Sequence, residues 1–255
     1  MPSIKQNRVR MQRVVLTVTK NEALTPLIYE MHLAGDVSGV TRAGQFVEIA
    51  LDGLYLRRPI SVCNYDEGEL TIIHKVVGKG TDLMSQMAEG TELDVLTGCG
   101  NGFDIDHECK KPLLVGGGVG VPPLYRLTRD LIARGKEVSV VLGFNTESEI
   151  FYADKFEALG AKVIIATADG SVGVKGFVTD AIRESGVEYD YFYSCGPLPM
   201  LKALCSATTT SGEVSLEEHM GCGFGICMGC SIQTTKGAKR VCKEGPVFKK
   251  EEGIW

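Results

Sequence analysis

The sequence predicts a β barrel plus α/β architecture: a small N-terminal antiparallel barrel, a doubly wound domain with a parallel sheet, and a short cysteine-rich C-terminal segment. Three observations support this prediction. Short runs rich in β-branched residues fill the first hundred positions, apolar strands alternate with helical segments over the next hundred, and closely spaced cysteines follow. We place the three parts at residues 1–109, 110–212 and 213–255.

The barrel prediction comes from short strand-like runs that are separated by turn-forming stretches. Within this part the segment "TDLMSQMA" is the one that looks helical. The strand-like runs are residues 13–19, 27–33, 45–51, 58–64, 69–77 and 92–98.

Two motifs in this part have both a structural and a functional interpretation. In "LYLRRPISV", Pro59 removes a ladder donor, so the strand lies at an edge or bends there. Arg58 is then either a solvated edge residue or the partner of a phosphate, with the Ser61 hydroxyl bonded to a heteroaromatic ring. In "GKGTDLM", Thr81 is either a helix cap or part of a helix start that receives a pyrophosphate.

A strand, a glycine turn and a helix start open the second part. The apolar run Leu113 to Val115 leads into Gly116, Gly117, Gly118 and Gly120. The segment after them places Leu124, Leu127 and Leu131 on one helical face. Glycines there permit a tight turn and the close approach of a pyrophosphate, although ordinary α/β packing also uses such a turn.

The next hundred residues repeat a βαβ pattern. Strand-like runs are predicted at 137–144, 161–167 and 189–197, alternating with helices at 151–159, 177–185 and 199–207. Ligands bind at the carboxyl ends of such strands. Because "GGGVG" and "SCGPLPM" both fall at strand ends, we expect them to face one site. Glu147 and Glu149 follow another strand, in a region without the Arg or Lys that a nucleotide 2′-phosphate could need.

Nine cysteines are present, and five of them are dispersed singly as buried small hydrophobes would be. The other four have the spacing C-x4-C-x2-C-x11-C. The C-x4-C-x2-C spacing of the first three cysteines matches plant-type [2Fe–2S] ferredoxins, whereas the last interval is shorter than in those proteins. The interleaved glycines allow backbone N–H groups to point at sulfur. Zinc or a purely structural cysteine cluster remain alternatives. The predicted metal ligands are Cys222, Cys227, Cys230 and Cys242.

Composition excludes several classes of partner. The chain is 44% hydrophobic and 23% charged, with a net charge of −5 and scattered basic residues. This charge predicts no binding to nucleic acid or to an anionic membrane surface. No apolar run approaches the roughly 20 residues of a membrane span, and the N-terminus lacks a signal-peptide core. We therefore expect a cytoplasmic protein.

The order of these parts, namely a barrel with R-P-I-S, a G-K-G-T helix start, G-G-G-x-G and C-G-P, resembles the ferredoxin-NAD(P)+ reductase flavoprotein family. With the cysteine segment, the chain is similar to the electron-transfer subunits of two-subunit, NAD-linked dihydroorotate dehydrogenases. This resemblance implies FAD in the barrel, NAD in the α/β domain and a [2Fe–2S] cluster. It also implies a separate FMN-bearing dihydroorotate dehydrogenase catalytic subunit as partner in pyrimidine biosynthesis.

The resemblance assigns residues to each cofactor. It names no general acid or base, and His74 on its apolar strand is interpreted as a wall residue. Ile60 stands where many relatives carry an aromatic residue that stacks on the flavin. The FAD positions are Arg58, Pro59, Ile60, Ser61, His74, Lys75, Val76, Gly80 and Thr81, and the NAD positions are Gly116, Gly117, Gly118, Gly120, Cys195, Gly196 and Pro197.

Two alternative functions remain. One is a flavin and iron–sulfur subunit of a sulfide dehydrogenase or of a ferredoxin-dependent NADP+ reductase complex, relatives in which an aspartate tends to replace one cluster cysteine. The other is a zinc-stabilised interaction module without electron transfer.

Overall fold

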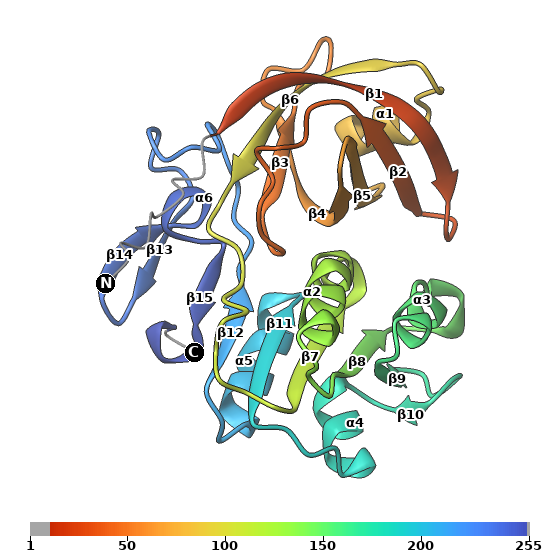
Figure 1. Cartoon of the computed structure of the whole chain (residues 1–255), viewed down its shortest axis with the longest axis vertical. Helices are drawn as coiled ribbons and strands as arrows, with labels where there is room; N and C mark the ends of the chain where they lie inside the picture. Colours follow the sequence, from red (N-terminus) through yellow and green to blue (C-terminus); the bar gives the residue numbers. More distant parts are fainter. Residues whose placement is uncertain (1–10, 254–255) are drawn as a thin grey trace.

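The computed structural model describes residues 11–253, so the basic N-terminal residues 1–10 lie outside the described part. A closed antiparallel barrel forms the first unit, with the strand order β1-β2-β5-β4-β3-β6 (Figure 1). This confirms the predicted barrel. Its strands are β1 (Gln12–Ala23), β2 (Ile28–Ala34), β3 (Phe46–Ile49), β4 (Arg58–Asp66), β5 (Glu69–Lys75) and β6 (Glu92–Cys99).

The barrel interior is filled by side chains that alternate along its strands. Leu16, Met31, Leu33 and Ile72 are fully buried there, as expected for a barrel too small to hold a channel. The short helix α1 (Lys79–Ser85) follows β5. The side-chain amide of Asn21 donates to the Met84 carbonyl at 2.9 Å, which ties the end of this helix to β1.

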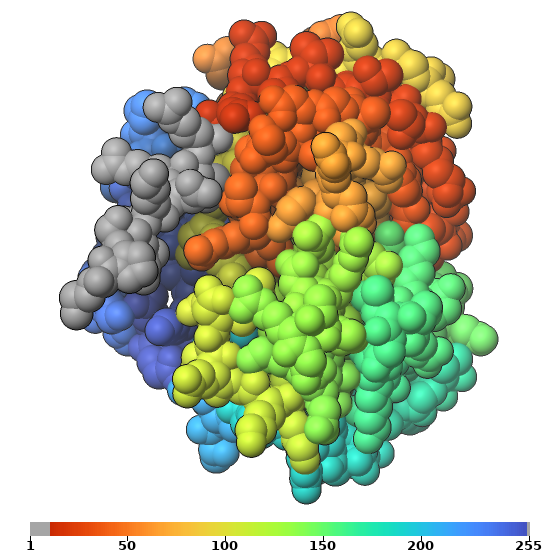
Figure 2. Space-filling view, in the orientation of Figure 1, coloured from red at the N-terminus to blue at the C-terminus, as the bar shows by residue number. Residues whose placement is uncertain are grey.

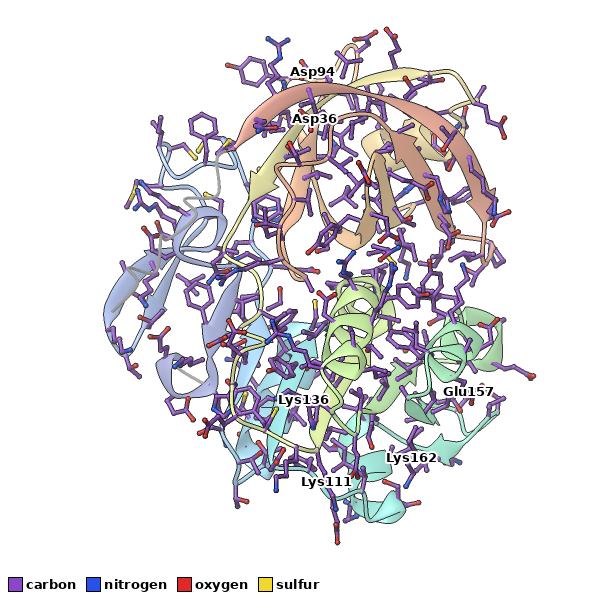
Figure 3. All side chains as sticks on the ribbon, viewed as in Figure 1. Asp36, Asp94, Lys111, Lys136, Glu157 and Lys162 are labelled. Carbon is purple, nitrogen blue, oxygen red and sulfur yellow. The ribbon has the colours of Figure 1, made fainter. Side chains whose placement is uncertain are left out.

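A short linker joins the barrel to the α/β domain and is fixed at several points. The Tyr193 hydroxyl donates to the Asp104 carbonyl at 2.8 Å. The Lys136 ammonium, labelled in Figure 3, donates to the carbonyls of His107 and Cys109 at 2.8 and 2.7 Å. These bonds hold the linker against the α/β domain.

The second unit is a seven-stranded sheet with the order β10-β9-β8-β7-β11-β12-β15, in which β15 is the antiparallel strand. Helices cover both faces, as predicted. The strands are β7 (Pro112–Gly117), β8 (Ser139–Phe144), β9 (Lys162–Thr167), β10 (Val174–Lys175), β11 (Tyr191–Cys195), β12 (Gly212–Ser215) and β15 (Val247–Lys249). The helices are α2 (Pro122–Ala133), α3 (Ala153–Ala158), α4 (Val178–Ser185) and α5 (Leu198–Ala207), with short 3-10 turns η1 (Gly118–Gly120) and η2 (Glu147–Glu149).

The strand order changes direction between β7 and β11. From β7 the chain proceeds through β8, β9 and β10 to one edge of the sheet, and β11 then pairs with the other side of β7. Helix α2 lies between the sheet and the barrel (Figure 1). In the space-filling view, green residues of the α/β domain lie directly against orange residues of the barrel (Figure 2). There the Arg126 guanidinium lies 3.9 Å from the centre of the Tyr65 ring on β4.

The C-terminal segment consists of the hairpin β13 (Ser231–Thr234) and β14 (Gly237–Arg240), helix α6 (Val241–Glu244), β15 and the turn η3 (Lys250–Glu252). Phe46 of the barrel packs with Cys230, Val241, Cys242 and Phe248 of this segment. Strands β12 and β15 also extend the α/β sheet, so the chain beyond residue 213 contacts both earlier units. The three residue boundaries themselves remain a prediction.

Candidate functional site

The two adjacent arginines of the R-R-P-I-S motif have different surroundings. Arg57 donates from Nη2 to both carboxylate oxygens of Asp94 at 2.9 Å and from Nη1 to the Asp94 carbonyl at 2.9 Å. Asp94 is labelled in Figure 3. Arg58 donates from Nη1 to the Leu56 carbonyl. A Cβ atom added to Gly80 would lie 2.2 Å from Arg58 Nε, so the guanidinium rests on the start of α1. The structure therefore brings Arg58 and the G-K-G-T turn together.

The other predicted FAD positions line the same part of the barrel. Pro59, Ile60 and Ser61 pair with Glu48, Val47 and Phe46 of β3, so the proline is accommodated at the start of β4. Thr81 Oγ1 accepts from the Val77 amide at 2.9 Å and donates to the Gly78 carbonyl at 3.1 Å, which confirms its capping role. Lys75 and Val76 are half-buried.

His74 is buried at the end of β5 and stacks on Tyr29, with ring centroids 5.8 Å apart. Both ring nitrogens are buried without a hydrogen-bond partner. Burial lowers the pKa of His74 to about 4, so the imidazole is neutral. Buried polar atoms are normally bonded, so two unpartnered nitrogens fit a wall that contacts a polar ligand.

The predicted NAD motifs meet at the reversal of strand order. Gly116 and Gly117 belong to β7, so the turn itself begins at Gly118, which has φ +52°. A Cβ atom on Gly120 would lie 2.2 Å from the Cys195 carbonyl oxygen and 2.5 Å from the Gly196 nitrogen. On Gly117 it would lie 3.2 Å from Pro197. The two motifs thus share the carboxyl ends of β7 and β11, where open α/β sheets bind ligands.

Backbone N–H groups point at the sulfur atoms of the cysteine segment. The amides of Ile226 and Cys227 donate to Cys222 Sγ at 3.3 and 3.5 Å. The Gly229 amide donates to Cys227 Sγ at 3.4 Å, and the Cys242 amide donates to Cys230 Sγ at 3.4 Å. Such bonds stabilise thiolates and tune bound clusters, and the sequence predicted them from the glycines.

The cysteines also differ in exposure and in pKa. Cys222 and Cys227 are on the surface, whereas Cys230 and Cys242 are buried against Phe46. Burial raises the pKa of Cys222, but the amides of Cys227, Phe224 and Ile226 outweigh it and lower that pKa to about 6. Burial and the neighbouring Cys230 raise the pKa of Cys242 to about 12, and Cys222 contributes to this rise. The four thiols therefore interact with one another.

The side chains in residues 11–253 do not form a closed group of three or more metal ligands. Amide-to-sulfur hydrogen bonds instead join Cys227 to Cys222 and Cys242 to Cys230. Four thiols with sulfur-directed amides suit iron–sulfur chemistry, which requires four thiolates. The four-cysteine ligand set remains a prediction.

Sequence reasoning missed a buried polar cluster between the barrel and the α/β domain. Glu30 on β2 accepts from the Tyr152 hydroxyl at 2.5 Å and from the Lys155 ammonium at 2.9 Å. His32 Nε2 lies 2.8 Å from the other Glu30 oxygen. We call Glu30, His32, Tyr152 and Lys155 the interdomain cluster. No local motif indicates this cluster, because Tyr152 and Lys155 lie 122 and 125 residues after Glu30 in the chain.

Two family models match the chain. The model for the iron–sulfur cluster binding domain of dihydroorotate dehydrogenase B matches residues 217–252, which contain all four cysteines. The oxidoreductase NAD-binding domain model matches residues 114–206, from β7 to the end of α5. These matches define the class of protein: an oxidoreductase with an NAD-binding domain and an iron–sulfur cluster binding domain.

Curated relatives identify the family within that class. The electron transfer subunit of dihydroorotate dehydrogenase B (NAD(+)) from Bacillus pumilus is 45% identical over 95% of this chain and 98% of its own length. The subunit of that name from Fusobacterium nucleatum is 44% identical over 91% and 95%. The chain belongs to the family of dihydroorotate dehydrogenase B (NAD+) electron transfer subunits.

Solved structures agree with this fold. A chain from the structure of an NADH-dependent reduced ferredoxin-NADP oxidoreductase, described for flavin-based electron bifurcation, has a TM-score of 0.87 and 31% identity, covering 95% of this chain and 90% of that one. A ferredoxin NADP+ reductase from Neisseria gonorrhoeae with bound FAD and NADP has a TM-score of 0.68 at 16% identity, covering 78% and 91%, and supports the fold alone. Together with the two domain matches, the 31% identical chain confirms FAD, NAD and a [2Fe–2S] cluster as the predicted cofactors. None of the helices between residues 11 and 253 is both long and apolar enough to cross a bilayer.

Proposed function

We propose that this chain passes electrons between NAD(H), FAD and a [2Fe–2S] cluster, and exchanges them with an FMN-bearing dihydroorotate dehydrogenase catalytic subunit. The observation that carries the proposal is the set of backbone amides directed at cysteine sulfurs on a loop that packs on the barrel. Family membership supports the electron-transfer role and the existence of a catalytic partner. The FMN of that partner and the cytoplasmic location are predictions from the sequence.

The cofactors supply hydride and single-electron chemistry when bound, and the protein supplies binding and orientation. Arg58 is suited to bind the FAD pyrophosphate because Arg57, unlike Arg58, is neutralised by Asp94. Gly118 and Gly120 let a dinucleotide approach β7 closely, beside Cys195. The four cysteines would hold the cluster.

The exposed apolar side chains of residues 222–230, which we call the cysteine loop, support a partner interface. Phe224, Ile226 and Met228 alternate with the ligands and are 39%, 75% and 54% exposed. Apolar side chains of this kind are enriched in the cores of protein–protein interfaces. A cluster beneath such a loop lies close to an acceptor in the partner subunit.

The proposal predicts that the isolated chain oxidises NADH with artificial dyes but does not reduce NAD+ with dihydroorotate. Co-expression with the FMN-bearing subunit is expected to give a stable complex that does. Steady-state assays of the chain and of the complex, with flavin and iron analysis, test this. The Ile226→Glu change should weaken association, because it places a charge in the interface core, and should leave NADH-to-dye activity intact. Dihydroorotate oxidation by the isolated chain would contradict the proposal.

A second prediction concerns Arg58. Replacing Arg58 by Gln should weaken FAD binding about 10- to 100-fold, because charge-assisted hydrogen bonds contribute about 1.5–3 kcal/mol. Fluorescence titration of the flavin-free chain with FAD measures the change. Arg129→Gln is the control, because Arg129 is exposed and bonds to Asp66 on the outer surface. Equal FAD affinity of both variants would remove Arg58 from the binding site.

A third prediction concerns the nicotinamide nucleotide. Glu149 accepts from the Asn145 side chain at 2.8 Å, and Glu147 begins the exposed turn η2 after β8. Because like charges oppose the 2′-phosphate, kcat/KM should be at least about tenfold higher for NADH than for NADPH. Glu147→Arg should narrow this ratio, and Glu157→Arg on the outer surface of α3 should not (Figure 3). An equal preference in the unmodified chain would show that the ribose pocket lies elsewhere.

The alternative of a ferredoxin-dependent NADP+ reductase subunit is favoured by one observation, the 31% identical chain with a TM-score of 0.87. The association experiment separates the two functions. Failure of the pair to associate at micromolar concentration would favour this alternative.

A further inference from the structure

Glu48 carries a buried carboxyl group and is not one of the residues assigned to FAD, NAD or the cluster. It lies in β3, it is 2% exposed, and its Oε1 atom is buried without a hydrogen-bond partner. Burial of a carboxyl oxygen without a hydrogen bond destabilises the folded protein, so we expect such a group to have a function in the site next to it. Its ladder partner in β4 is Pro59, next to Arg58. One side of Glu48 therefore adjoins the proposed FAD site.

The other side of Glu48 adjoins the cysteine loop. A Cβ atom added to Gly223 would lie 2.2 Å from Glu48 Oε1 and 2.6 Å from Cδ. Gly223 has φ +72°, in the left-handed region that favours glycine. Gly223, which follows Cys222, thus has no side chain at the point where the Glu48 carboxyl group contacts the cysteine loop.

The electrostatics agree with this position. Burial raises the pKa of Glu48 to about 7 against the opposing effect of Arg57, while the charge of Cys222 raises it and that of Arg58 lowers it. Glu48 is therefore within electrostatic range of one residue assigned to FAD and one assigned to the cluster.

We propose that Glu48 is a positioning residue that seats the cysteine loop on the barrel between the two redox sites and lowers the reduction potential of the cluster. This inference rests on the proposed function. Reduction adds one negative charge to a cluster, and a buried carboxylate nearby disfavours that charge because little solvent screens it. The contact also holds the loop against β3, the strand that pairs with Pro59 of β4.

Glu48→Gln tests the electrostatic part, because it removes the charge and preserves the shape. A potentiometric titration of the cluster, followed by its EPR signal, is made at alkaline pH, which favours the ionised carboxylate. We expect a shift to higher potential at unchanged iron and FAD content. Glu92→Gln is the control, because Glu92 is an exposed glutamate of the same barrel. An unchanged potential in Glu48→Gln would overturn this part.

Gly223→Ala tests the seating. The matched control is Gly237→Ala in the β13–β14 hairpin, which has φ +94° but no atom within 4 Å of its added Cβ. Both changes strain the backbone, and only the first one collides with Glu48. Gly223→Ala should lose more bound iron than Gly237→Ala, and a second change, Glu48→Ala, should restore part of it. Equal iron loss in the two glycine variants, without rescue, would overturn the seating.

Iron and FAD analysis of the unmodified chain shows whether a negative result contradicts the role of Glu48 or the proposed function itself. If it binds neither iron nor FAD, the proposed function fails. If it binds both and the Glu48 and Gly223 variants behave like their controls, only the role of Glu48 fails.

Discussion

Replacement of Cys227 by Ser is expected to remove the iron–sulfur cluster and leave most of the FAD bound. A serine hydroxyl does not replace a thiolate ligand at neutral pH, and because Cys227 is exposed, solvent can reach the iron atom that has lost its ligand. The flavin should survive because the barrel is a closed unit with its own core. Iron and flavin analysis of anaerobically purified protein, with its visible absorption spectrum, measures both quantities.

The matched control is Cys205→Ser. Cys205 is buried in α5 among the helices of the α/β domain, and its thiol is outside the cysteine segment. Its variant should retain two irons per chain, the number in a [2Fe–2S] cluster. Full iron occupancy in Cys227→Ser would remove Cys227 from the ligand set, and stoichiometric zinc without flavin in the unmodified protein would contradict the entire assignment.

Replacement of Glu30 by Gln is expected to destabilise the protein by about 2–4 kcal/mol. Glu30 is 2% exposed, and the change leaves the Tyr152 hydroxyl and the Lys155 ammonium without their anionic partner. Thermal unfolding of the FAD-loaded chain tests this, since each kcal/mol shifts the midpoint by roughly 2–4 °C in a chain of this size. Glu22→Gln, which removes an exposed partner of Lys20, should leave the midpoint unchanged.

The destabilisation by Glu30→Gln has a defined pH dependence. Burial raises the pKa of Glu30, but bonds from Tyr152, His32 and Lys155 outweigh it and lower the pKa to about 2. A carboxyl with a lowered folded-state pKa stabilises fully above its unfolded pKa of about 4.3, and this contribution is lost as the pH falls towards 2. The difference between the two proteins should therefore be constant from about pH 8 to pH 5. A difference that disappears within this range would contradict the assigned bonds.

Local sequence patterns were sufficient for the architecture. Runs of β-branched residues became the barrel strands, and Leu124, Leu127 and Leu131 became the buried face of α2, because hydrophobic periodicity follows directly from backbone geometry. The glycine turn was placed correctly at the end of β7, although Gly116 and Gly117 are strand residues. Their burial against α2 and Met200 depends on neighbours that the local sequence does not contain.

The sequence was enough to predict an iron–sulfur site and a nucleotide site, because cysteine spacing and glycine turns are short motifs whose chemistry depends on adjacent residues. Only the tertiary structure separated Arg57, bound to Asp94, from Arg58, which rests on Gly80. It alone placed Glu48 against Gly223. Such contacts join strands and loops far apart in the chain, and their energies depend on burial and on partners. A local pattern contains neither, so the contacts appear only when the chain is folded.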